Sequence, residues 1–225
     1  MPRHYPQTKD ELQSLVDDLS INLGDIETCF VADMRELFWD TERVDFSGIE
    51  SWDTSRVENM AEMFRGAKGF NADISSWDTS RVKNMGSMFS RATDFNQNIN
   101  SWDVSNVEYM SEMFCGALNF NQPLNSWNVS KVKNMSEMFK GANNFNQPLD
   151  KWDTQSVKEM KEMFYCAKNF NQNINSWNVS NVEDMNEMFK GAINFNQNLD
   201  SWNVDSVNIE MFEGSPLQNN PPKWY

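Results

Sequence analysis

Residues 120–139 read FNQPLNSWNVSKVKNMSEMF, and this stretch recurs along the chain at a step of 25 residues. Its tryptophan, Trp127, has equivalents at Trp52, Trp77, Trp102, Trp152, Trp177 and Trp202. The Met-Phe pair that ends the stretch recurs from Met63-Phe64 to Met188-Phe189. A 25-residue unit is too small to enclose a core alone, so we expect successive copies to stack and to cover one another's open side.

Within one copy, two segments carry different periods. Residues 124–129 carry apolar side chains at Leu124, Trp127 and Val129, and polar Ser126 and Asn128 alternate with the last two. This alternation predicts a short strand over 124–129. Strands one repeat apart would run in the same direction, so the expected ladder is parallel.

The next segment has a helical period. Its apolar residues fall at i, i+3, i+7 and i+10, and they are Val107, Met110, Phe114 and Ala117. Ser105 and Glu108 have the spacing of a capping box. The pattern predicts a helix of two to three turns, or a 3₁₀-like turn, ended by a left-handed residue. Glycine stands at that end in most copies, with Arg91 and Cys166 as exceptions.

The ends of the chain differ from the middle, as stacked repeats require. Residues 1–50 are expected to form an N-terminal cap, with a helix over 8–19, and a degenerate first coil. Residues 51–206 are the regular repeats, and residues 207–225 are a shortened last repeat and a C-terminal cap. Trp224 and Tyr225 are expected to cover the last core face. All three parts belong to one continuous domain.

Charge and composition exclude several function classes. The chain of 225 residues has 33 acidic and 19 basic side chains, a net charge of −14, which argues against non-specific binding to nucleic acid. No apolar run approaches the ~18 residues of a membrane span. The motifs GxxxxGK[ST], GxSxG, HExxH and GxGxxG are absent, so we expect no enzyme, no catalytic residue, no metal and no cofactor.

The repeat unit resembles that of mycoplasma-type surface proteins, which are grouped with BspA-like leucine-rich repeats. The resemblance covers about residues 25–215 and rests on the unit quoted above, which ends in Met-Phe-x-Gly-Ala. It implies an α/β repeat solenoid, a right-handed leucine-rich-repeat-like stack of about seven to eight coils. It also implies a location on the cell surface. The three cysteines form no CxxC pair and no signal segment is visible, which instead favours free thiols and the cytoplasm.

The residue after each tryptophan forms the main candidate site. This column reads Asp53, Asp78, Asp103, Asn128, Asp153, Asn178 and Asn203. Neighbours in a parallel ladder lie about 4.8 Å apart, so the column would form an acidic strip that suits a basic partner. A solvated ladder that bonds local backbone, with Arg56 and Arg81 compensating its charge, explains the same residues.

Tyr109 and Tyr165 stand at positions that vary between copies, so both are candidates for an exposed contact with a partner; scattered surface tyrosines are the simpler explanation. The sequence therefore predicts a non-enzymatic protein-interaction module with a basic protein partner. The alternatives are a surface adhesin or antigen, an intracellular inhibitor of a basic toxin, and a ladder that binds glycans or ice.

Overall fold

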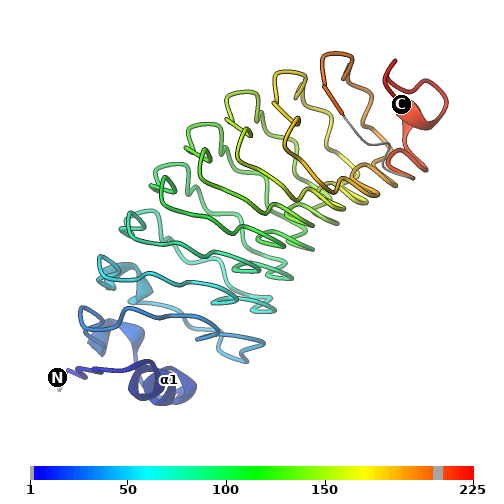
Figure 1. The fold of residues 1–225 in the computed structure, drawn as a ribbon. Coiled ribbons are helices and arrows are strands. Elements are labelled where there is room, and N and C mark those ends of the chain that lie inside the picture. Colours follow the sequence, from blue (N-terminus) through cyan, green and yellow to red (C-terminus); the bar gives the residue numbers. More distant parts are fainter. Residues whose placement is uncertain (1–2, 205–209) are drawn as a thin grey trace.

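A computed structural model describes residues 3–204 and 210–225 of the protein. The coils follow one another along one long axis, with helix α1 (Lys9–Asp17) near one end and the C-terminus at the other (Figure 1). Parallel bridges join equivalent residues of successive coils: Asp33, Asn59, Asn84, Tyr109, Asn134, Glu159 and Asp184. Val207, where the shortened last repeat was expected to begin, lies outside the described residues.

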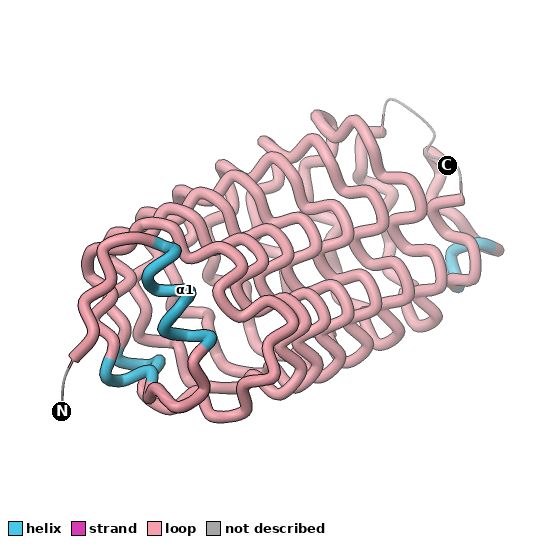
Figure 2. The backbone as a smooth tube through the Cα atoms, turned by 90° about the horizontal axis from the view of Figure 1, so that it is seen from below, coloured by secondary structure: helices cyan, strands magenta, loops and turns pink. Residues whose placement is uncertain are grey.

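Helical structure is confined to the two ends of the described chain (Figure 2). The 3₁₀ helices are η1 (Leu23–Asp25), η2 (Ile49–Ser51) and η3 (Pro216–Gln218). Thr8 caps α1, because its hydroxyl accepts a hydrogen bond from the amide of Glu11 over 3.2 Å. The helix ends at Asp17 rather than at residue 19, and Leu19 is 60% exposed. Among the described residues, no helix is both long and apolar enough to cross a bilayer.

Of the two structures expected over 107–117, the helix is wrong and the turn is nearer, because this segment is a series of tight turns. Alternate amides point to the next coil: Glu112 donates to the carbonyl of Ser136 over 2.8 Å and Phe114 to Met138 over 2.9 Å. The amides between them bond three residues back, as Cys115 does to Glu112 over 2.9 Å. Glu112 has a φ of 56°, a left-handed conformation that a helix does not tolerate. Ser105 and Glu108 therefore cap no helix.

The expected strand over 124–129 is also wrong, since the parallel bridges lie in the turn segment instead. Beside the tryptophans the coils are joined by side chains: the Ser126 hydroxyl donates to the carbonyl of Asn100 over 2.7 Å. Stacked indole rings repeat at 6.4 Å between Trp52 and Trp77. The backbone hydrogen bonds of residues 124–129 stay within one coil, so side chains join the coils here. The candidate column is thus not part of a sheet.

The core is a continuous set of apolar columns that runs through the coils. The tryptophans of the repeat are 3–4% exposed and the methionines and phenylalanines of the Met-Phe pairs are 0% exposed. Phe64 stacks on Phe70 of its own coil at 3.7 Å and on Phe89 of the next at 5.7 Å between ring centroids. Burying such a side chain contributes about 1.5–3 kcal/mol, so each coil is stabilised chiefly by its neighbours.

The C-terminal end of the core is closed as the sequence predicts. Trp224 stacks on Trp202 at 6.2 Å between ring centroids, and its Nε1 donates to the carbonyl of Leu199 over 2.7 Å. Tyr225 packs edge-on against Phe212 at 5.0 Å. Trp224 thus takes the place that the next repeat tryptophan would fill.

Arg43 fastens the N-terminal cap to the first coil, a role that the sequence did not indicate. Its side chain is buried, and its guanidinium donates to the carbonyls of Val16 (2.9 Å), Asp18 (2.8 Å), Ile21 (3.2 Å) and Asp45 (3.3 Å). Val16 and Asp18 lie at the C-terminal end of α1, where carbonyls lack helical partners. Burial lowers the pKa of Arg43, and the nearby aspartates oppose that effect.

Candidate functional site

The aspartate and asparagine column lies on the surface, and each of its members is exposed. From Asp53 to Asn178, each Oδ1 accepts a hydrogen bond from the backbone amide two residues later, over 2.9–3.2 Å. Asn203 is exposed as well. The side chain therefore builds the turn that follows each tryptophan. This bond is the local-backbone role expected as the alternative, and it occupies one oxygen of each carboxylate.

The aspartates at the start of the column are held in their charged form. Hydrogen bonds from the hydroxyl and amide of Ser55 hold the pKa of Asp53 below its usual range, although the charge of Asp78 opposes this. Ser80 does the same for Asp78, with help from the charge of Arg81. Within residues 3–204 and 210–225, no ion pair involves any carboxylate of the column.

The positions beside the column hold the coils together. Thr54 donates its hydroxyl to the carbonyl of Asp78 over 3.0 Å, and Thr79 donates to Asp103 over 2.9 Å. On the other side, Ser101 donates to the carbonyl of Ser75 over 3.0 Å. These hydroxyls have structural partners, so the outward-facing aspartates remain the candidate groups for a ligand.

The two candidate tyrosines do not form one patch. Tyr109 is 45% exposed and lies in the column of parallel bridges. Tyr165 stands two coils further along, half-buried, with the ammonium of Lys140 5.2 Å from its ring centroid. A cation–π contact already uses one face of that ring. Tyr109 is therefore the better exposed of the two candidates.

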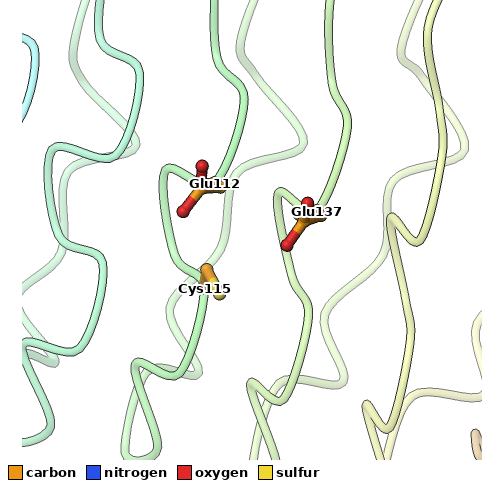
Figure 3. A group of neighbouring side chains, drawn as sticks. All are labelled: Glu112, Cys115 and Glu137. Carbon is orange, nitrogen blue, oxygen red and sulfur yellow. The ribbon is translucent and has the colours of Figure 1, made fainter.

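Three potential metal donors meet at Glu112, Cys115 and Glu137 (Figure 3). Glu112 and Cys115 belong to one coil and Glu137 to the next, with their donor atoms within 4.8 Å of one another. Burial, and then the two glutamates, raise the pKa of the Cys115 thiol, although metals bind the thiolate. Lys140 also donates to Glu137 over 2.9 Å. A divalent cation in this cluster would therefore have to displace the proton of the Cys115 thiol and the ammonium group of Lys140.

A charge ladder, which is a column of charged residues of both signs and was not among the sequence predictions, lies five residues after the acidic column along the repeats. At a step of 25 residues it reads Glu58, Lys83, Glu108, Lys133, Lys158 and Glu183. Ion pairs join Glu58 to Lys83 at 2.7 Å, Glu108 to Lys133 at 2.5 Å and Lys158 to Glu183 at 2.7 Å. The alternation of sign at the repeat step was the signal that would have revealed it.

The repeats also identify the family. A family model described as "Mycoplasma protein of unknown function, DUF285" matches residues 32–150 and again residues 117–224. The chain belongs to the DUF285 family. The two DUF285 matches overlap over residues 117–150 and together cover the repeats from the first coil to Trp224, as a tandem array requires. No curated protein and no solved structure matches the chain.

Proposed function

We propose that this DUF285 chain is a non-enzymatic protein-interaction module whose acidic edge, Asp53, Asp78 and Asp103, binds a basic partner. The observation that carries the proposal is the state of these three carboxylates. Each is exposed and uses its Oδ1 in a local turn, without an ion pair in the described chain. Complementary charge of this kind speeds association and selects the partner.

The step of the acidic edge fits an extended basic segment. The tryptophans directly before these aspartates stack with ring centroids 6.4 Å and 6.5 Å apart, and we expect the carboxylates to repeat at a similar step. Alternate residues of an extended chain point to the same side and lie about 6.6 Å apart. A partner strand with lysine or arginine at every second position therefore presents one cation to each carboxylate.

Removal of charge without loss of the turn tests the proposal. The column itself contains asparagine, and Asn128 accepts the same amide bond from Ser130 over 3.2 Å. The triple variant Asp53→Asn, Asp78→Asn, Asp103→Asn should therefore keep the fold. We expect at least tenfold weaker binding of a peptide with alternating lysines, measured by calorimetry at low salt.

The control variant, Asp10→Asn, Asp17→Asn, Asp94→Asn, removes the same charge from other exposed positions. Equal loss of affinity in both triple variants would show a general effect of net charge and reject the acidic edge. A second peptide carries the same number of lysines as one contiguous run. It has equal charge but the wrong spacing, so it tests the spacing separately.

We also propose that the stack is leucine-rich-repeat-like, of the BspA-like kind. The support is the parallel bridging between equivalent residues and the single core of repeated apolar columns. A crystal structure tests this proposal through the handedness of the coils, which we expect to be right-handed. A left-handed path would separate the chain from leucine-rich repeats.

A further inference from the structure

The charge ladder has one break in its alternation. Glu58, Lys83, Glu108 and Lys133 alternate in sign, but Lys133 is followed by Lys158 in the next coil. The two backbones are in contact, since the amide of Lys158 donates to the carbonyl of Lys133 over 2.9 Å. Their ammonium groups turn to opposite sides, one to Glu108 and the other to Glu183. A gap therefore lies between the two ammonium groups.

A hollow of about 580 Å³ lies over this break. Its charged lining consists of Lys131, Lys133, Lys158, Glu108 and Glu183. Ser130, Gln155, Ser156 and Asn181 complete it. The volume lies within the range of small-molecule sites. The lining thus has a net positive charge in a chain whose overall charge is −14.

The lysines can be recruited at low cost. Lys133 and Lys158 are more than half exposed, and ion pairs at such positions contribute little to stability. Lys131 donates to the side-chain oxygen of Asn106 over 2.7 Å and forms no ion pair within the described residues. An anion in the gap would therefore gain three ammonium donors and would relieve the repulsion between Lys133 and Lys158.

We propose that this hollow, the lysine hollow, binds the phosphate or sulfate group of a small organic monoester. A tetrahedral oxyanion offers several acceptor oxygens, so it can bridge lysines from two coils at once, which a single carboxylate of the protein does not do here. The neutral polar side chains around the lysines are suited to the remainder of such a ligand. This site is independent of the acidic edge.

Titration of the full chain with glucose 6-phosphate, glucose 6-sulfate and glucose, followed by NMR of the lysine side chains, tests the proposal. We expect saturable binding of one or both esters, with shifts at Lys131, Lys133 and Lys158, and no binding of glucose. The relative affinity of the two esters identifies the preferred oxyanion. Absence of saturable binding by both esters, or equal binding of glucose, would overturn the proposal.

The variant Lys133→Gln, Lys158→Gln should weaken ester binding at least tenfold. Its matched control is Lys151→Gln, Lys168→Gln, which removes the same charge from exposed positions outside the hollow and should bind normally. Amide spectra of both variants verify the fold. Equal weakening in the two variants would mean non-specific attraction and would also overturn the proposal.

Discussion

The indole Nε1 of Trp127 donates a hydrogen bond to the carbonyl oxygen of Ile99, in the preceding coil, over 3.1 Å. Both residues are buried. The same bond joins Trp77 to Ile49, Trp102 to Ile74, Trp152 to Leu124, Trp177 to Leu149 and Trp202 to Ile174. Each repeat tryptophan thus packs in the core and also fastens its coil to the one before.

Substitution Trp127→Phe should lower the free energy of unfolding by about 2 kcal/mol, because the smaller ring leaves a cavity in the core. The Ile99 carbonyl also loses the indole donor and keeps only the amide of Trp102. Urea denaturation followed by circular dichroism measures the change. Trp39→Phe is the matched control, since Trp39 is 51% exposed and should change stability by about 0.5 kcal/mol or less. Equal effects of the two substitutions would contradict the role of the indole bond.

Substitution Cys166→Gly should stabilise the protein by about 1 kcal/mol, because side chains other than glycine are strained in the left-handed region. Cys166 has a φ of 54°, at a column position where Gly141 has 65° and Gly191 has 70°. Thermal denaturation under reducing conditions measures the effect. Cys166→Ala removes the thiol but keeps the strain, so a gain from alanine as large as that from glycine would reject this explanation.

Substitution Arg43→Met should loosen the N-terminal cap by about 3 kcal/mol, since the buried carbonyl of Val16 and the part-buried carbonyls of Asp18 and Ile21 lose a charged donor together. Hydrogen exchange of the amides in α1 should become faster, while the amides of the later coils stay protected. Arg35→Met serves as control because the Arg35 side chain is 52% exposed. Unchanged exchange in α1 would show that other contacts hold the cap.

Stability should fall with pH in the acid range. Asp53 and Asp78 have pKa values below the ordinary 3.8, held down by the hydroxyl and amide of Ser55 and Ser80. A carboxyl with a lowered native pKa stabilises the fold fully above its unfolded pKa, and this contribution is lost as pH falls through the native value. Urea midpoints should therefore be level from about pH 7 to 5 and fall below about pH 4.

In the double variant Asp53→Asn, Asp78→Asn, the acid decrease should be smaller, because asparagine keeps the turn and does not titrate in this range. Midpoints measured from about pH 7 to 3 in both proteins give the comparison. An identical pH profile in the variant would assign the decrease to other carboxyl groups.

The column that the sequence marked as a binding site is partly explained by the fold. The aspartates were identified from their position after each tryptophan, and the structure places them on the surface. Their bonds to the next amide could have been inferred from the turn preference of aspartate and asparagine. The absence of a backbone ladder beside the tryptophans of the described coils could not, since it depends on how segments 25 residues apart pack against one another.

The sequence by itself determined the repeat and the buried columns, because burial depends on residue type and recurs at a fixed step. Trp127, Met138 and Phe139 are buried as their column positions require. Only the tertiary structure decided the backbone between them. Apolar residues three apart suit a helix, but they equally suit turns in which Met113 bonds back to Met110. The choice depends on amides such as that of Glu112, whose acceptor, the carbonyl of Ser136, lies in the next coil. Local periodicity carries no information about such a distant partner.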